Sequence, residues 1–118
     1  MTARIRNLTR NTELGASIEI ADTSAKRRMG LLKRSGLAPG EGLWILPCES
    51  VHTFFMKFPI DLVYLDKKCA VRKVRHAVGP WRMSACFTAH SILELPAGAA
   101  RASGTIAGDQ LEIERSVS

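Results

Sequence analysis

Apolar and polar side chains alternate in short runs along most of the chain, which is typical of strands with one buried face. Glycine, proline, asparagine and aspartate separate these runs and provide the turns between them. The pattern predicts about eight strands, which lie near residues 4–10, 17–21, 43–46, 50–58, 60–65, 69–78, 91–95 and 110–114. We expect the first strand at a sheet edge, because its alternation is poor. Irregular alternation around Arg72-Lys73 indicates a β-bulge.

One stretch departs from simple alternation, because residues 60–65 are apolar on both faces apart from Asp61. Burial of both faces indicates a central strand. A buried carboxylate needs cationic or backbone N–H partners, or it stays protonated. If an antiparallel partner strand precedes this one, with the turn at Phe58-Pro59, Met56 lies opposite Asp61 and His52 lies two pairs further along. His52 and Asp61 then either border a ligand or catalytic pocket, form a structural pair, or occupy unrelated positions.

A single segment has the features of a helix, because Asp22-Thr23-Ser24 offers N-capping side chains before an amphipathic run. The pattern predicts a helix over about residues 24–34. A second, short helix of one or two turns is predicted within residues 97–103. Because no strand–helix–strand unit repeats, the predicted fold class is mostly β or α+β. We expect a curled mixed or antiparallel sheet that forms a small barrel-like domain with one firm helix and one short helix.

The length of 118 residues predicts a single domain over residues 1–118. No run approaches the ~20 apolar residues of a membrane helix, and the first residues lack the apolar region of a signal peptide. We therefore expect a cytoplasmic protein with no membrane partner. The three cysteines are odd in number and form no C-x-x-C motif, which argues against a disulfide framework or a structural zinc site. No metal and no cofactor are expected, because P-loop and dinucleotide-binding motifs are also missing from the sequence.

The net charge of +6 makes this a basic protein, and the charge is unevenly distributed. Residues 1–34 hold eight Lys or Arg against three acidic residues. A basic face attracts polyanions. However, the sequence contains no helix-turn-helix, aromatic RNA-binding or zinc-finger motif. A solvated face is the simpler interpretation of these basic residues, which include Lys26, Arg27, Arg28, Lys33 and Arg34 in the predicted helix.

Several motifs occur together in a recognisable order. They are Thr23-x-x-x-Arg27-x-x-Gly30-Leu31-Leu32-x-Arg34, Gly40-Glu41-Gly42-Leu43, His52-Thr53-Phe54-Phe55-Met56-Lys57-Phe58-Pro59-Ile60-Asp61, Leu93-Glu94-Leu95-Pro96-Ala97-Gly98 and Gly108-Asp109. Over about residues 22–113 the chain resembles the bacterial and archaeal family known as domain of unknown function 192 (DUF192). The resemblance implies a compact β-rich fold with a helix or two and no established biochemical activity. It assigns no catalytic role to the shared motif positions, which correspond here to Arg27, Arg34, Met56, Asp61, Glu94 and Asp109.

Three functional hypotheses remain open. The leading one is a non-enzymatic module that binds a small ligand or a protein partner in a pocket formed by His52, Met56, Asp61 and Glu94. The first alternative is a small acid/base hydrolase that uses His52 with Asp61 or Glu94. The second is weak nucleic-acid binding through the basic helix 24–34. Glu94 is also a candidate for a structural ion pair with Arg27 or Arg34. The sequence leaves the ligand, any catalysis and the oligomeric state open.

Overall fold

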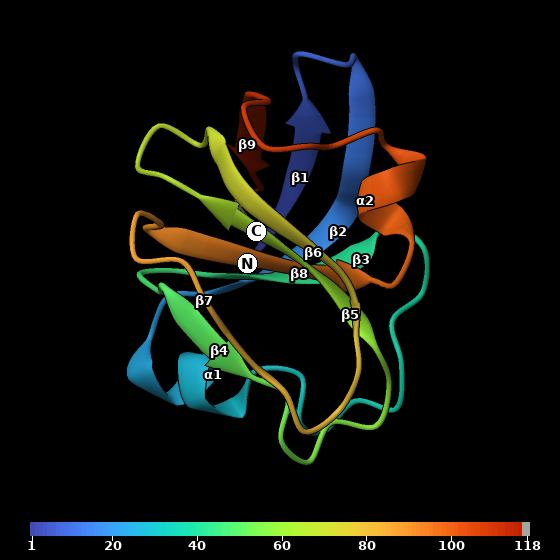
Figure 1. Ribbon diagram of the computed structural model, residues 1–118, viewed down its shortest axis with the longest axis vertical. Helices are drawn as coiled ribbons and strands as arrows, with labels where there is room; N and C mark the ends of the chain where they lie inside the picture. The colour runs from blue at the N-terminus through green and yellow to red at the C-terminus, as the bar shows by residue number, and fades with distance from the viewer. Residues whose placement is uncertain (117–118) are drawn as a thin grey trace.

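Nine strands and two short helices make up the computed structural model, which describes residues 1–116 (Figure 1). The helices are α1 (Ser24–Met29) and α2 (Ala99–Ala102). The strands are β1 (Thr2–Asn7), β2 (Thr12–Ala21), β3 (Glu41–Ile45), β4 (Ser50–His52), β5 (Ile60–Leu65), β6 (Val71–Val78), β7 (Met83–Ala85), β8 (Ser91–Pro96) and β9 (Leu111–Arg115). This confirms the predicted class, a β-rich fold with two small helices.

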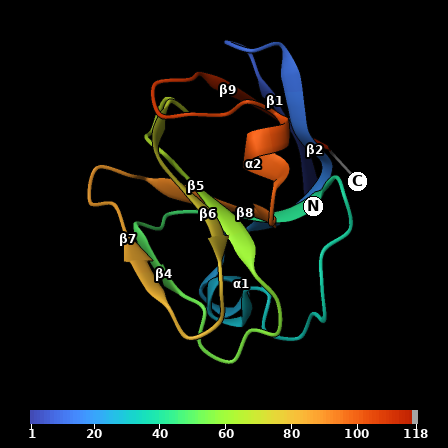
Figure 2. The ribbon, with the colours of Figure 1, turned by 45° about the vertical axis from the view of Figure 1, so that its right-hand side comes forward.

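Seven of the strands form one curled sheet in the order β6–β5–β8–β3–β2–β1–β9. Neighbours are antiparallel except β2 and β3, which run parallel, so the sheet is mixed. The segments that precede β6 and β9 approach each other at one end of the curl. There Ala70 and Gln110 form a bridge, and the Leu111 amide donates a hydrogen bond of 3.0 Å to the Cys69 carbonyl. The sheet is therefore a half-barrel, as the two ribbon views show (Figure 1, Figure 2).

The central strands β5, β8 and β3 are buried on both faces, because a different layer covers each face. On the inner face, Val63 and Leu65 pack with residues of β1 and β2 and with Ala100 of α2. On the outer face, Tyr64 packs in a second cluster that includes Leu31. Figure 2 places α1, β4 and β7 together on this outer side. The predicted central strand over residues 60–65 is confirmed, since all six residues are buried between β6 and β8.

Helix α1 is shorter than predicted. The Thr23 hydroxyl caps it by accepting a hydrogen bond of 3.2 Å from the Lys26 amide, as the sequence suggested. The helix then ends at Met29 and does not reach Arg34, because Gly30 has a φ of 49° that does not continue a right-handed helix. No residue of α1 is buried. Instead Leu31, which is 2% exposed, anchors the following turn to the outer cluster.

The predicted hairpin around Phe58-Pro59 is wrong. Strand β4 pairs with β7 in a separate two-stranded sheet, with His52 opposite Met83, whereas β5 pairs with β6 and β8. A loop of residues 53–59 separates β4 from β5, so Met56 does not lie opposite Asp61. Strand β7 was not predicted, because its three residues hold only one buried side chain and show no apolar alternation.

The first strand is not an edge strand either, since β1 lies between β2 and β9. Its burial alternates strictly, but two of the inward positions are the small Ala3 and the polar Asn7, which hide the pattern in the sequence. The edges of the sheet are β6 and β9. The bulge predicted around Arg72-Lys73 is confirmed by a register shift, because Tyr64 pairs with Lys73 while Leu65 pairs with Val71.

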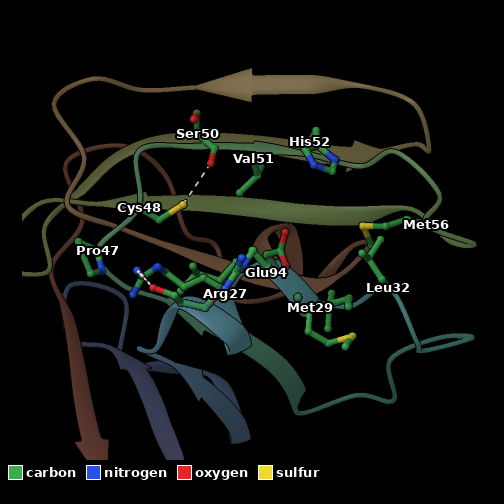
Figure 3. A pocket seen from close by; sticks show the side chains of 15 residues that line it. Arg27, Met29, Leu32, Pro47, Cys48, Ser50, Val51, His52, Met56 and Glu94 are labelled. Atoms are coloured by element: carbon green, nitrogen blue, oxygen red, sulfur yellow. Dashed lines mark hydrogen bonds between the residues drawn. The ribbon is translucent and has the colours of Figure 1, made fainter.

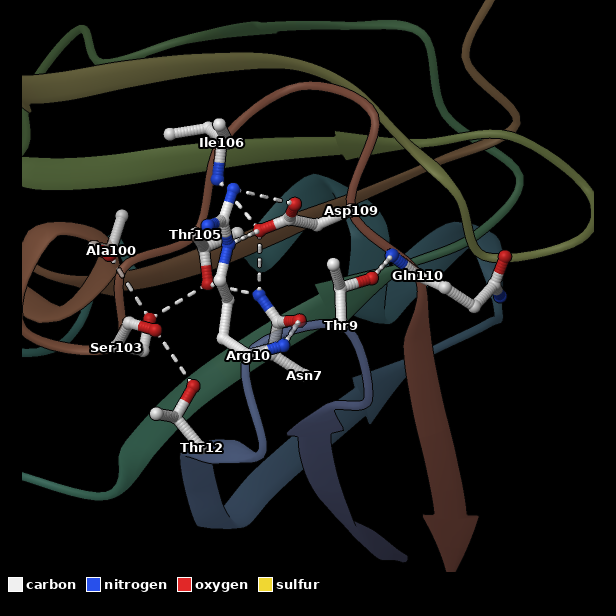
Figure 4. A network of polar contacts seen from close by, with 10 residues as sticks. All are labelled: Asn7, Thr9, Arg10, Thr12, Ala100, Ser103, Thr105, Ile106, Asp109 and Gln110. Carbon is white, nitrogen blue, oxygen red and sulfur yellow. Dashed lines mark hydrogen bonds and ion pairs between the residues drawn. The ribbon is translucent and has the colours of Figure 1, made fainter.

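A buried polar network joins the β1–β2 turn to the segment before β9 (Figure 4). The Asp109 carboxylate accepts hydrogen bonds from Arg10 at 3.1 and 3.3 Å and from the Asn7 amide group at 3.0 Å, and Asn7 also donates to Thr105. Burial acts to raise the pKa of Asp109, but the bonds from Arg10, Asn7 and the Ile106 amide outweigh burial and hold that pKa below its usual value. Asp109 therefore stabilises the junction between the two ends of the chain.

Candidate functional site

A cavity of about 580 Å³ lies on the outer side of the central sheet. Helix α1 and the turn after it form one wall, and the segment that runs through β4 forms the other. Figure 3 shows Cys48, Val51 and His52 on the β4 side and Met29 on the opposite side, with Glu94 between them. The volume lies within the range of about 300–1,000 Å³ that is usual for small-molecule sites.

Glu94 reaches this cavity because of its position on β8. Side chains alternate along a strand, and Leu93 and Leu95 belong to the inner cluster of the half-barrel. Glu94 therefore points to the outer face, as does Ile92 in the outer cluster. Its cross-strand neighbours are Leu43 on β3 and Leu62 on β5, so the carboxyl group stands on an apolar surface.

The carboxyl group of Glu94 has no partner within residues 1–116. The residue is 3% exposed, and the three ion pairs of the described chain involve other residues. Burial raises the pKa of Glu94 from 4.5 to about 7, and no opposing interaction lowers that pKa. The carboxyl oxygens keep access to the cavity, because the enclosed side-chain polar atom that lacks a partner in residues 1–116 is Trp44 Nε1. The ion pair of Glu94 with Arg27 or Arg34, one of the two expectations for this acid, is not formed in the structure.

Two arginines of α1, Arg27 and Arg28, also line the cavity. The Arg27 guanidinium makes only long contacts with neutral oxygens, at 3.5 Å to the Leu46 carbonyl and 3.4 Å to the Ser24 hydroxyl. Neither arginine is among the ion pairs of residues 1–116. The cavity therefore contains one acidic and two basic side chains that do not neutralise one another.

The β4 wall includes Cys48. Its thiol is half-buried and donates a hydrogen bond of 3.1 Å to the Ser50 carbonyl. Burial raises the pKa of this thiol, so Cys48 stays protonated and is not an activated nucleophile. Val51 lies beside it and contributes apolar surface. No motif in the sequence marked Cys48, because its place in the wall depends on the path of the chain after Pro47.

His52 and Met56 both line the cavity, and His52 is exposed at its rim. The His52 ring packs on Phe54 with the centroids 4.9 Å apart, and Phe54 stacks on Trp81 at 5.6 Å. Met56 is 7% exposed and belongs to the outer cluster. The aromatic stack therefore connects the rim of the cavity to the loop that contains Trp81.

Thr53 joins the loop of residues 53–59 to the loop that contains Trp81. Its hydroxyl donates to the Gly79 carbonyl at 2.7 Å and accepts from the Arg82 amide at 2.9 Å. Its backbone carbonyl accepts hydrogen bonds from the amides of Met56 at 3.2 Å and Trp81 at 3.1 Å. Thr53 is 1% exposed, so water cannot replace these bonds. The position of Met56 in the cavity depends on this residue.

We expect Thr53→Val to lower the free energy of unfolding by about 2 kcal/mol, because it removes the hydroxyl that bonds the Gly79 carbonyl and the Arg82 amide. Thr53→Ser keeps the hydroxyl and is the matched control, with an expected loss below about 1 kcal/mol. Urea denaturation followed by circular dichroism measures both. Equal losses for the two variants would show that the methyl group, and not the hydroxyl, stabilises the loops.

Asp61 lies on the other face of the sheet from the cavity. Alternation along β5 places it with Val63 and Leu65 on the inner face, and it does not line the cavity. Its carboxylate accepts hydrogen bonds from three backbone amides, those of Ala77, Gly98 and Ala100, at 2.8, 3.0 and 2.9 Å. The structure thus brings His52, Met56 and Glu94 together and separates Asp61 from them.

Arg34 also lies outside the site. Its guanidinium pairs with Glu19 at 2.9 Å on the surface. Within residues 1–116, no cluster of three or more His, Cys, Asp or Glu side chains is arranged to hold a metal ion. Over the same residues, no helix combines the length and the apolar character needed to span a membrane.

These features define a small half-barrel protein with a charged cavity between its first helix and its outer sheet face. The DUF192 family model, described as an uncharacterized ACR, matches residues 6–113, so the chain belongs to this family. It is 32% identical to a UPF0127 protein of Pyrococcus abyssi, over 92% of this chain and 95% of that protein. It is also 32% identical to a UPF0127 protein of Pyrococcus furiosus, over 94% and 98% of the two chains. The resemblance predicted from the sequence motifs is confirmed.

Two solved structures share the fold. A Sinorhizobium meliloti protein, provisionally described as a transcription regulator, matches with a TM-score of 0.82 and 23% identity, over 94% of this chain and 91% of that one. A Novosphingobium aromaticivorans protein of unknown function matches with a TM-score of 0.77 and 22% identity, over 93% and 82%. At this level of identity the two matches establish the architecture and not an activity.

Proposed function

We propose that this protein is a non-enzymatic binding module that takes a small polar ligand in the cavity between α1 and β4. Glu94 is the group that recognises the ligand, and Met56, Val51 and Met29 provide apolar contacts. The observation that carries the proposal is Glu94, a residue only 3% exposed that forms no ion pair within residues 1–116 and whose carboxyl group faces a cavity of about 580 Å³.

The energetic argument concerns the cost of burying that acid. A carboxyl group without hydrogen bonds is destabilising when it is removed from water, and a leucine at this position would not be. The surrounding Ile92, Leu43 and Leu62 show that the site tolerates apolar side chains. A ligand that donates hydrogen bonds to Glu94 would recover this cost on binding. Perturbed, desolvated acids in clefts are for this reason candidates for functional residues.

The four methionines permit a direct test of this proposal. Met29 and Met56 line the cavity, whereas Met1 and Met83 do not. We expect a cavity ligand to shift the ¹³C-methyl NMR signals of Met29 and Met56 and to leave those of Met1 and Met83 in place. A screen of neutral, cationic, anionic and zwitterionic metabolites covers the possible classes. At about one hundred times its Kd, a ligand should stabilise the protein by about 2.7 kcal/mol.

The matched variants are Glu94→Gln, which removes the charge and keeps the shape, and Glu112→Gln on the exposed surface of β9. We expect the first to weaken binding and the second to leave it unchanged. If no compound of any class moves the signals of Met29 and Met56 in the parent protein, the proposal is wrong.

An acid/base hydrolase is a second candidate, in which Glu94 acts with His52. The favourable observation is the pKa of Glu94, which burial raises to about 7, close to the optimum for a general acid near neutral pH. His52 and Glu94 share the cavity, but no hydrogen bond joins them within the described chain. Asp61 is not a partner in this scheme, because it lies on the inner face. Conversion of a bound compound, in place of its unchanged release, would favour this candidate.

Nucleic-acid binding is a weaker candidate. It is supported by the description of the Sinorhizobium meliloti protein and by the exposed Lys26 and Arg28 on α1. Arg34 is paired with Glu19, and α1 ends at Met29, so the basic surface is smaller than the sequence predicted. Binding of this kind would weaken steeply with added salt.

A further inference from the structure

We propose that the ligand of this cavity is a small zwitterion, whose ammonium group pairs with Glu94 and whose carboxylate or phosphate group pairs with Arg27. This inference rests on the proposed binding function and adds the chemical class of the ligand. It follows from three observations: Glu94 is buried and forms no ion pair, Arg27 makes only long contacts with neutral oxygens, and apolar side chains form much of the remaining wall.

The first observation concerns the donor that Glu94 needs. No side chain of residues 1–116 forms an ion pair with it, and it is 3% exposed. Hydrogen bonds between a carboxylate and an ammonium group are about twice as strong as those between neutral groups. They gain further strength where water is excluded. An ammonium group is therefore the ligand feature that compensates best for the burial of this acid.

The second observation concerns the arginines. A ligand with an ammonium group alone would enter a cavity that also holds Arg27 and Arg28, and these would repel it. Arg27 has donors to spare, because its contacts of 3.4 and 3.5 Å are long and involve neutral oxygens. A planar guanidinium group matches the geometry of a carboxylate or a phosphate. An oxyanion on the same ligand would both satisfy Arg27 and cancel the repulsion.

The third observation concerns the rest of the cavity. Met29, Leu32, Val51 and Met56 line it beside the polar Ser24, Ser50 and His52, so the ligand part that contacts these four side chains is aliphatic or otherwise apolar. The two methionines are adaptable side chains that accommodate different shapes. Free amino acids with aliphatic side chains combine these features, and aminophosphates share the pair of charges.

The test compares ligands that differ by one charged group. L-leucine carries both charges, 3-methylbutylamine lacks the carboxylate, 4-methylpentanoate lacks the ammonium group, and 4-methylpentanamide is neutral. Phosphoethanolamine, which combines an ammonium and a phosphate group on a two-carbon chain, tests separately whether a phosphate can serve as the oxyanion. Titrations followed by the methyl signals of Met29 and Met56 give each Kd. We expect a zwitterion to bind at least about tenfold more tightly than either singly charged analogue.

Variants assign the two charges to residues. Glu94→Gln should abolish the tighter binding of L-leucine relative to 4-methylpentanoate. Arg27→Met should abolish its tighter binding relative to 3-methylbutylamine. Arg34→Met, an arginine outside the cavity, should change neither. Urea denaturation establishes that each variant is folded.

Proton release provides a second measurement. Because burial raises the pKa of Glu94 to about 7, this residue is mostly protonated at about pH 6. Pairing with an ammonium group ionises it, so calorimetry in buffers of different ionisation enthalpy should show release of close to one proton. A neutral ligand that accepts a hydrogen bond from the protonated acid would release none.

The outcomes separate this inference from the proposed function. If neutral or singly charged compounds bind in the cavity as tightly as the zwitterions, or if Arg27→Met leaves the Kd of L-leucine unchanged, the inference is wrong and the binding function stands. If no compound of any class shifts Met29 and Met56, both are wrong.

Discussion

Replacing Asp61 by alanine is expected to lower the free energy of unfolding by about 4 kcal/mol, the largest effect that we predict for a single side chain. The carboxylate is fully buried and accepts hydrogen bonds from the amides of Ala77, Gly98 and Ala100. Alanine leaves three donors without partners in a region that excludes water. Asp61 also supports strained backbone, because Ala77 has a φ of 47° next to the shift in register of β6.

The matched control is Asp66→Ala in the turn after the same strand. The Asp66 carboxylate also accepts from two backbone amides, those of Lys68 and Ala70, at 2.9 and 3.0 Å. Asp66 is only half-buried, so in the alanine variant water can accept the hydrogen bonds of the two amides. The expected loss in the free energy of unfolding is about 1 kcal/mol. Asp61→Asn, which keeps one acceptor oxygen, serves if the alanine variant does not fold. Similar losses at positions 61 and 66 would contradict the structural role assigned to Asp61.

The second large effect concerns Glu94 and pH. In the unfolded chain the pKa of Glu94 is 4.5, whereas burial raises the pKa of Glu94 in the folded chain to about 7. Between these values the folded state binds more protons than the unfolded state, so this residue makes stability fall as the pH rises. The decrease amounts to about 3 kcal/mol between about pH 5 and 8.

Glu94→Gln removes that decrease. We expect the variant to be more stable than the parent by about 3 kcal/mol at about pH 8 and similar to it near pH 5. Urea denaturation across this range measures the difference between the two proteins, in which contributions common to both cancel. Glu112→Gln, at an exposed position, should follow the parent curve. If the curves of the parent and Glu94→Gln run parallel, Glu94 is ionised in the folded protein and has a partner.

The parts of the fold that were predictable are those in which local pattern and burial agree. The run of residues 60–65 is apolar on both faces, and only a strand with neighbours on each side and layers above and below can bury it. The cap of α1 at Thr23 is equally local, because the hydroxyl bonds an amide three residues further on. By contrast, the end of α1 depends on the φ of Gly30, which the sequence permits but does not require.

Long-range pairing was not predictable from the pattern. The residues of β4 have strand character in the sequence, but the partner of β4 is β7, some thirty residues further along the chain. The candidate site shows the same limit. Strand alternation is enough to place Glu94 on the opposite face from Leu93 and Leu95, but nothing local in the sequence indicates that α1 lies over it. Asp61 and Glu94 have similar apolar neighbours in the sequence and yet face opposite sides of the sheet.

The placement of the two tryptophans gives the protein built-in optical reporters. Trp44, 6% exposed, lies in the inner cluster with the Arg115 guanidinium 5.1 Å from its ring, whereas Trp81 is 56% exposed beside the aromatic stack that leads to the cavity. Quenching by acrylamide will therefore select the emission of Trp81, and the blue-shifted emission of Trp44 will follow the interior of the half-barrel. Fluorescence can thus follow events at the rim of the cavity separately from melting of the barrel, without any attached dye.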